Sequence, residues 1–295
     1  MELHQLRYFL EIARQENFTH AAEVLHITQP MLTRVVKQLE RELGMLLIER
    51  TSKSFRLTDA GELFAAQARE LLLAQEDLVR RMHDLKEART GEVRLSIPSV
   101  LLDAYFPTLL TEFGKAYPGI RISIVEEGSK PAVKSVLHGD ADLALVMLPV
   151  SNADELVSHT VLRDVCRLVV AESHPFAGRD AVSVPELAGE RLITFSDTAT
   201  LHDALVNLCA TYGFVPNLVY KSFLPRFIFE MVSHGDSVAV LPDPIIRKHK
   251  AERQVAVLLT PTLPWEIAVI HKRDRYQTFA AERLRSFLYD YFDEM

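Results

Sequence analysis

Side chains suited to nucleic-acid binding recur in one predicted helix near the N-terminus. Gln29, Thr33 and Lys37 follow one another at intervals of four residues, which places them on one face of a helix, and Pro30 and Arg34 join that face. An amide can pair with adenine, a guanidinium with guanine or phosphate, and an ammonium with phosphate. The pattern indicates a DNA-reading helix. Its alternative is the solvated polar face of an ordinary surface helix.

The elements around this face have the spacing of a helix-turn-helix. Residues 3–14 carry apolar side chains at a 3.6-residue period, and a short helix is predicted over 19–25, followed by a turn. Thr28 then stands at the N-cap, where its hydroxyl would accept from free backbone N–H groups, and Pro30 falls in the first turn, where its missing N–H costs nothing. The helix that starts there would enter the major groove with its N-terminal residues.

A hairpin is predicted directly after this helix. The segment LLIERTSKSFRLT reads as two short strands around a Thr-Ser-Lys-Ser turn, and Thr58 can cap the helix that follows. Such a hairpin would form a wing whose basic residues reach flanking phosphates. The residues expected to contact DNA are Thr28, Gln29, Pro30, Thr33, Arg34, Lys37, Arg50, Lys53 and Arg56.

A long helix is predicted from Asp59 to Ala88, which contains no proline and only one glycine, near its start. At ~1.5 Å per residue it would be ~45 Å long. Its apolar stripe repeats every seven residues at Phe64, Leu71, Leu78 and Leu85, with Ala68 and Met82 beside it. A partner helix from a second subunit is the expected cover for this stripe. Packing against the rest of the same chain is the alternative.

Beyond Thr90 the pattern changes to alternating strands and helices, which predicts βαβ units, an α/β fold class and a parallel sheet. The tripeptide His-Gly-Asp at 138–140 leads into an apolar strand that ends in Leu-Pro, and the same tripeptide at 234–236 does so again. We interpret these halves as two similar lobes. A chance repetition of helix, glycine and strand is the alternative.

Composition limits the classes of function. The net charge of −7 disfavours binding of nucleic acid over the whole surface, although a local basic face still attracts phosphate within about 10 Å. Two cysteines are too few for a disulfide scaffold and favour a reducing cytoplasm. We find no export signal and no apolar stretch of the ~20 residues that a membrane span needs. Motifs for metals, nucleotides or a catalytic serine are also missing, so we expect no metal, no cofactor and no enzyme.

Residues 1–61 closely resemble the N-terminal domain of LysR-type transcriptional regulators. The shared motifs are FTHAAEVL, HITQP, LTR, QLERELG and RLTDAG. The rest of the chain, to about residue 290, agrees with the linker helix and effector-binding domain of that family. Two departures stand out: Met31 replaces the usual Ala, which bears on base preference, and Leu47-Ile48 replaces the usual approach to the wing.

The resemblance implies a winged helix-turn-helix, a long linker helix and a two-lobed α/β domain like that of periplasmic binding proteins. We expect a DNA-binding domain over 1–58, a linker and dimerisation helix over 59–90, and an effector domain over 91–295. Lobe I would comprise about 91–161 and 267–295, and lobe II about 162–266. Implied partners are promoter DNA, a small-molecule effector, a second copy of the chain (usually within a homotetramer) and RNA polymerase, but no membrane.

The family's effector-contacting positions can be transferred to this sequence. Ser99 and Ser129 match two cleft hydroxyls, each at a predicted helix start, where simple N-capping is the alternative. The resemblance implies the effector-binding residues Ser99, Val100, Ser129, Thr198, Thr200, Phe223 and Arg226. Helix N-termini attract carboxylates, so these residues predict a small anionic or polar effector.

Three other readings compete with a ligand-controlled regulator. A solute-binding protein would need an export signal and would not use the first sixty residues. An enzyme would need a nucleophile or cofactor motif. Peroxide-sensing members of the family use a cysteine pair in the second lobe; Cys209 lies near one such position, but the segment where its partner would stand reads DTATLH. Cys166 falls in a predicted buried strand, so we expect two inert thiols.

Overall fold

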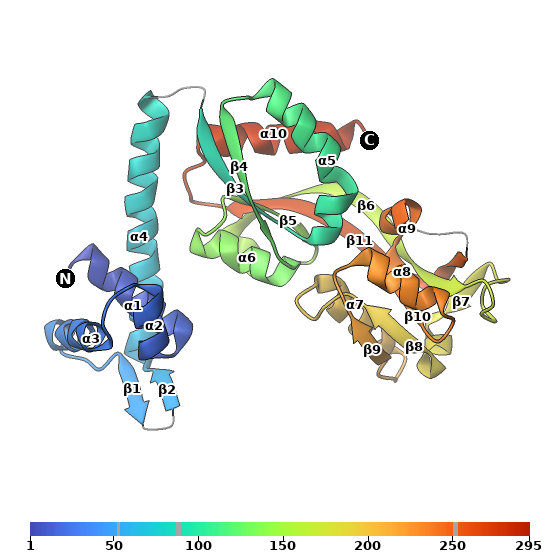
Figure 1. Ribbon diagram of the computed structural model, residues 1–295, viewed down its shortest axis with the longest axis horizontal. Helices are drawn as coiled ribbons and strands as arrows, with labels where there is room; N and C mark the ends of the chain where they lie inside the picture. The colour runs from blue at the N-terminus through green and yellow to red at the C-terminus, as the bar shows by residue number, and fades with distance from the viewer. Residues whose placement is uncertain (52–53, 87–89, 250–252) are drawn as a thin grey trace. The chain divides into compact units, whose positions relative to one another are not determined.

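The structure is a computed structural model that describes residues 1–51, 54–86, 90–249 and 253–295. It contains two compact units, Met1–His83 and Asp84–Met295, each described by itself below (Figure 1). The elements of the first unit are α1 (Leu3–Gln15), α2 (Phe18–Val24), α3 (Gln29–Leu43), β1 (Ile48–Thr51), β2 (Ser54–Leu57) and the long α4 (Asp59–Lys86).

The first three helices pack around a small apolar core. Its fully buried side chains include Phe9, Ile12, Leu32, Val36 and Leu39. The Asn17 side chain caps α2 by accepting from the backbone N–H groups of Thr19 and His20, at 2.9 and 3.2 Å. Thr28 is the N-cap residue of α3, yet its side chain makes no capping hydrogen bond. The predicted hydroxyl cap is therefore wrong, and the fixed backbone angle of proline in the first turn remains as the local signal that starts α3.

The hairpin is joined to the helices by side chains at both of its ends. Glu40 of α3 accepts from the backbone N–H groups of Leu47 and Ile48 at 3.0 and 3.3 Å. The Thr58 hydroxyl accepts from the Gly61 N–H at 2.9 Å, which confirms the predicted cap of α4. A side chain at position 61 would place a Cβ atom 2.0 Å from the Leu47 carbonyl oxygen, so only glycine fits this approach. These contacts fix where the wing stands relative to α3.

The apolar stripe of α4 has two parts. Near its start, Phe64 meets Phe9 edge-on at 4.9 Å between ring centroids, and Ala68 is buried. Further along, Leu71, Leu78 and Met82 are 51%, 61% and 59% exposed. The side chain of Leu85 lies outside the described residues. The first part of the stripe thus packs on its own chain, as the alternative reading expected, whereas the second part has apolar side chains in solvent.

The second unit is built on one large twisted sheet. Its first elements are β3 (Gly91–Ile97), α5 (Ser99–Ala116), β4 (Ile120–Glu126), α6 (Ser129–His138), β5 (Leu143–Met147), the turn Ala153–Glu155 and β6 (Leu156–Ala171). They are followed by β7 (Ala181–Ser183), the 3-10 turn Val184–Gly189, β8 (Arg191–Thr194), α7 (Thr200–Thr211), β9 (Asn217–Lys221), α8 (Pro225–Ser233), β10 (Val238–Pro242), α9 (Asp243–His249), β11 (Gln254–Lys272) and α10 (Phe279–Asp293).

The order of strands is β4-β3-β5-β11-β6-β10-β8-β9, with β7 beside β11. β3, β4 and β5 run parallel in one half, and β8, β9 and β10 run parallel in the other. The long strands β6 and β11 pair antiparallel between them and pass through both halves (Figure 1). The predicted parallel pairing is confirmed within each half, whereas the antiparallel pairing of β6 and β11 between the halves was not predicted. Pro261 and Pro264 interrupt the pattern of β11, and the ladder shifts register between Leu258 and Leu263.

Each parallel half repeats one local pattern, as the sequence predicted. Gly139 after α6 has φ 81°, and Gly235 after α8 has φ 84°, a backbone region that favours glycine. The strands that follow, β5 and β10, are buried along their whole length. Alternate residues of β5 serve opposite faces of the sheet: Leu143 and Leu145 belong to the large core with α5 and α10, whereas Ala144 packs with α6.

None of the helices in the described ranges combines the length and apolarity needed to cross a bilayer.

Candidate functional site

The polar face of α3 carries three cationic side chains. Pro30, Thr33, Arg34, Lys37 and Arg41 line one shallow hollow on this helix. The opposite face, formed by Leu32, Val35, Val36 and Leu39, is buried in the core of the unit, which turns the polar face to solvent. The Gln29 amide donates to the Thr33 hydroxyl at 3.1 Å and is exposed beside it.

The charges of this face are available to a ligand. Arg34 and Lys37 are exposed, and within the described part of the chain neither is within 4.0 Å of a carboxylate. A protein with a net charge of −7 therefore has a local basic face on the helix that the sequence singled out. Attraction between such a face and phosphate acts over about 10 Å and does not depend on the overall charge.

The predicted wing residues are only partly described. Arg56 is exposed on β2, where its Cα faces Glu49 of β1. Arg50 lies on β1, opposite Phe55, but its side chain and the whole of Lys53 fall outside the described residues. Of the nine predicted DNA contacts, the structure thus places Thr28 at the N-cap of α3, five others along α3 itself and Arg56 on the neighbouring hairpin.

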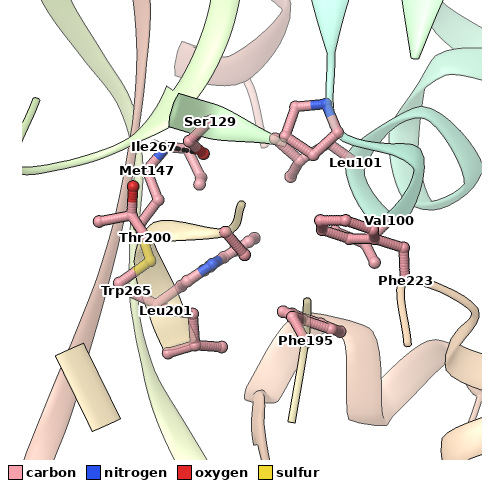
Figure 2. Close-up of a pocket in the computed structure, with 12 residues that line it drawn as sticks. Val100, Leu101, Ser129, Met147, Phe195, Thr200, Leu201, Phe223, Trp265 and Ile267 are labelled. Carbon is pink, nitrogen blue, oxygen red and sulfur yellow. Dashed lines mark hydrogen bonds between the residues drawn. The ribbon is translucent and has the colours of Figure 1, made fainter. Parts of the chain in front are cut away.

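A second candidate site is a pocket within the second unit, between the two halves of the sheet (Figure 2). In this conformation it encloses about 20 Å³, room for roughly one water molecule, behind an open mouth. The lining residues are Pro98, Val100, Leu101, Ser129, Met147, Phe195, Ala199, Thr200, Leu201, Phe223, Trp265 and Ile267. Several of them follow the carboxyl ends of parallel strands, which is where open α/β sheets bind ligands.

Ser129 is the first residue of α6 and only 4% exposed. Its hydroxyl accepts from the Met147 N–H at 3.0 Å, so it links the start of α6 to the end of β5. The N-cap residues are Gly128 for α6 and Pro98 for α5, so neither Ser129 nor Ser99 stands at an N-cap. The N-capping alternative is therefore excluded for both serines, and both predicted helix starts are confirmed.

The structure brings four of the seven predicted effector residues into the pocket: Val100, Ser129, Thr200 and Phe223. Ser99, Thr198 and Arg226 are not among the residues that line it, and the Arg226 side chain is exposed on α8. Sequence reasoning missed Met147 at the end of β5, and it missed Trp265 and Ile267 because it did not predict the strand β11 as a wall of the pocket. Trp265, the only tryptophan of the chain, was the available signal.

Polar contacts join the two halves on one side of this pocket. The Lys130 ammonium, at the start of α6, lies 2.6 Å from a carboxylate oxygen of Asp203 on α7 and donates to the Asp197 carbonyl at 2.6 Å. The Lys130 backbone N–H donates to the Thr198 carbonyl at 3.2 Å. A Cβ atom on Gly128 would lie 2.7 Å from that same carbonyl oxygen, so the close approach of the two segments requires glycine.

A second set of contacts joins α5 to α9. The Asp103 carboxylate lies 2.7 Å from Nε2 of His249, and the Lys248 ammonium donates to the Asp103 backbone carbonyl. The halves of the sheet are therefore joined by charged groups both at α6 and α7 and at α5 and α9.

Both cysteines are free and buried, Cys166 in β6 and Cys209 in α7. Burial raises the pKa of both thiols above the ordinary value, and the Asp164 carboxylate raises that of Cys166 further. Fewer thiolates form as a result, and the thiolate is the form that reacts with peroxide.

Comparison with known proteins gives matches over nearly the whole chain. The family described as "Bacterial regulatory helix-turn-helix protein, lysR family" matches residues 3–62, and "LysR substrate binding domain" matches residues 86–293. A relative from Bacillus subtilis, the uncharacterized HTH-type transcriptional regulator YwbI, is 35% identical over 295 residues, covering 98% of each chain. AlsR, an HTH-type transcriptional regulator of the same organism, is 28% identical over 82% of this chain and 80% of its own.

Solved structures agree with the fold. A hydrogen-peroxide-bound OxyR mutant from Corynebacterium glutamicum is 27% identical and superposes with a TM-score of 0.60, over 99% of this chain and 94% of that one. Full-length CbnR in complex with its target DNA has a TM-score of 0.61 at 21% identity, over 98% and 99% of the two chains.

Proposed function

Because the chain belongs to the LysR family of DNA-binding transcriptional regulators, we propose that it binds promoter DNA through α3 and the β1–β2 hairpin, under the control of a small molecule in the pocket of the second unit. The observation that supports this most directly is the exposed basic face of α3, whose Arg34 and Lys37 have no carboxylate partner among the described residues. Regulation is the proposed activity, and no catalytic step is assigned. The cytoplasm is its proposed location.

Each DNA-facing residue has a distinct proposed role. Gln29, Thr33 and Arg34 lie near the start of α3 and would reach base edges, as in other helix-turn-helix proteins. Thr28 and Pro30 would bring the backbone at the helix start close to the duplex. The basic residues further along would neutralise phosphates and set the register: Lys37 and Arg41 on α3, and Arg50, Lys53 and Arg56 on the wing.

The first test is the salt dependence of binding to a DNA fragment taken from upstream of the gene for this chain. We expect the logarithm of the affinity to fall linearly with the logarithm of salt concentration, with a slope of about −0.9 per neutralised phosphate. Lys37→Ala should reduce the steepness of that slope by about one unit. A gel-shift titration at several salt concentrations measures both.

The matched control is Lys115→Ala, which removes the same charge from an exposed position on α5 in the second unit. It should leave the slope unchanged. Binding that does not respond to salt, or equal slopes for the two variants, would contradict the proposed DNA-binding face.

We place the domain boundaries at 1–58, 59–90 and 91–295, with self-association through α4 and a tetramer as the assembly. An effector shifts such an assembly only by binding one arrangement of the lobes better than another, a coupling of typically ~1–3 kcal/mol. Closure of the pocket would change the spacing between paired DNA-binding domains. DNase footprints that differ with and without effector would support this scheme, and identical footprints would count against it.

The similarity to a peroxide-bound OxyR suggests peroxide sensing as a second candidate. The burial of both cysteines and their raised thiol pKa values argue against it. We expect operator affinity to change less than about twofold after peroxide treatment, since buried thiols of raised pKa react slowly. Gel shifts of treated and untreated protein measure this. Cys209→Ser serves as the control variant, and oxidant-dependent activation that this substitution abolishes would establish redox sensing instead.

A further inference from the structure

We propose that Lys130 and Asp203 form a latch beside the pocket, and that an effector binds only when this latch opens. The inference rests on the proposed function, because it takes the pocket as the effector site. It adds the residues that control entry to that site. With the latch closed, the pocket encloses about 20 Å³, room for roughly one water molecule. Any larger molecule therefore requires the walls of the pocket to separate.

The latch joins the start of α6 in one half of the sheet to the start of α7 in the other. The Lys130 ammonium lies 2.6 Å from a carboxylate oxygen of Asp203 and donates to the Asp197 carbonyl, also at 2.6 Å. The Lys130 backbone N–H donates to the Thr198 carbonyl at 3.2 Å. The two side chains of the ion pair are 41% and 51% exposed, and a solvated pair of this kind adds little stability. Such a contact can open and close without disturbing the fold of either half.

The latch lies at the boundary between the pocket and a larger hollow. This hollow, of about 490 Å³, is lined by Lys130 and Asp203 with other residues of α6, of α7 and of the segment 149–151. Ser129 and Thr200 line both spaces, and Figure 2 shows them on the same side of the pocket. When Lys130 and Asp203 separate, we expect the two spaces to merge into one site of the size that small molecules occupy.

The other charged contact between the halves lies elsewhere. Asp103 of α5 contacts His249 of α9 at 2.7 Å, and neither residue is part of the lining of the pocket or of the adjoining hollow. The contact of Lys130 is therefore the one whose loss opens the pocket itself.

Gly128 allows the two segments of the latch to approach each other. It is the N-cap residue of α6, with φ −70° and ψ 164°, a backbone conformation that any residue adopts. A Cβ atom on this residue would nevertheless lie 2.7 Å from the Thr198 carbonyl oxygen, which belongs to the backbone of the other half. Alanine at position 128 is therefore compatible with α6 and incompatible with the closed latch.

Quenching of Trp265 fluorescence by acrylamide measures the opening of the latch in the full chain. Trp265 is the only tryptophan, lines the pocket and is 2% exposed, so an uncharged quencher reaches it when the pocket opens. Lys130→Glu places a carboxylate against Asp203 and should raise the quenching constant by about 1.5- to 5-fold, the effect of losing an exposed ion pair on an opening equilibrium. Gly128→Ala should raise it as well.

The charge-exchanged variant Lys130→Glu, Asp203→Lys tests the pair itself. It restores an ion pair, so its quenching constant should return most of the way to that of the unaltered chain. The matched controls are Lys115→Glu, at an exposed position on α5, and Gly189→Ala, where a Cβ atom meets nothing within 4 Å. Both controls should leave the quenching constant unchanged.

Unchanged quenching in Lys130→Glu, or no recovery in the charge-exchanged variant, would overturn the proposed latch. If Gly128→Ala does not fold, the two Lys130 variants decide the question. Gel shifts of the unaltered chain with operator DNA separate this outcome from failure of the proposed function. A chain that retards operator DNA but shows no effect of Lys130→Glu on quenching contradicts the latch alone, whereas a chain that does not bind DNA contradicts the proposed function.

Discussion

Replacing Leu71 and Leu78 of α4 with glutamate is expected to split the assembly into smaller ones that lack the α4 pairing, and to lower the affinity for operator DNA by about 100-fold or more. Sedimentation velocity measures the first effect, and a gel-shift titration of the same preparations measures the second. The size of the effect on DNA binding follows from bivalence. Two linked DNA-binding units hold a two-part operator with an avidity that exceeds the affinity of either unit alone by roughly 10² to 10⁴.

The exposure of the second part of the α4 stripe is the physical reason for this expectation. Leu71, Leu78 and Met82 are each more than half exposed, although they lie at helical spacing on one face. A buried leucine contributes about 1.5–3 kcal/mol relative to an exposed one, so covering this face with the same face of a second copy stabilises a dimer. Glutamates at the same positions would bring carboxylates of both copies together in the seam, where burying and opposing like charges is unfavourable.

The control for added charge is the double variant Val215→Glu and Leu224→Glu. Both residues are also apolar and exposed, at 84% and 64%, but they belong to the second unit rather than to α4. This variant should keep the assembly state and the operator affinity of the unaltered protein. A Leu71→Glu, Leu78→Glu protein that sediments like the unaltered protein and binds operator with the same affinity would refute the proposed role of α4.

Local signals in the sequence were sufficient for much of the fold. The apolar periods predicted α1, α3 and α4, and Thr58 predicted the start of α4 because a threonine cap acts within three residues of its own position. The repeated His-Gly-Asp tripeptide predicted two equivalent turns for a similar reason: the left-handed backbone at Gly139 and Gly235 is a local requirement. Each of these features depends on residues that are close in the sequence.

Features that depend on distant parts of the chain were not predictable in this way. β11 pairs with β6 over most of its length, across a separation of roughly a hundred residues, and its prolines obscure the strand pattern. Thr28 has the residue type of a cap, but its hydroxyl does not bond to the helix. Residue type therefore suggested an interaction that the surrounding structure does not make.

The polarity of the pocket is the clearest case of this limit. Ser129 and the start of α6 suggested an anion site, and the structure does place that serine in the pocket. The carbonyl of Thr198 and the carboxylate of Asp203 then take the donors of Lys130, and both come from segments about seventy residues further along the chain. The charge of a binding site depends on every segment that folds next to it, so a local motif alone does not predict that charge.

The second large effect concerns the stability of the second unit, where Asp142→Ala is expected to lower the free energy of unfolding by about 3–5 kcal/mol, the usual cost of leaving a buried charge without its partner. The Asp142 side chain is 5% exposed and lies directly before β5. It accepts from the backbone N–H of Arg94 at 2.9 Å and from the guanidinium of Arg94 at 2.9 Å. Arg275, whose side chain is 4% exposed, lies 3.9 Å away.

These contacts make one carboxylate hold together three segments: β3, the start of β5 and the chain leading into α10. Urea unfolding followed by Trp265 fluorescence measures the loss, since the only tryptophan of the chain lies in this unit. Asp140→Ala removes a carboxylate two residues away, where the side chain is exposed, and should cost less than about 0.5 kcal/mol. Equal urea midpoints for the two variants would mean that other groups balance the charges of Arg94 and Arg275 when the Asp142 carboxylate is removed. A loss of stability in Asp142→Ala alone would show that this one carboxylate supplies the ionic contact that holds β3 and β5 together.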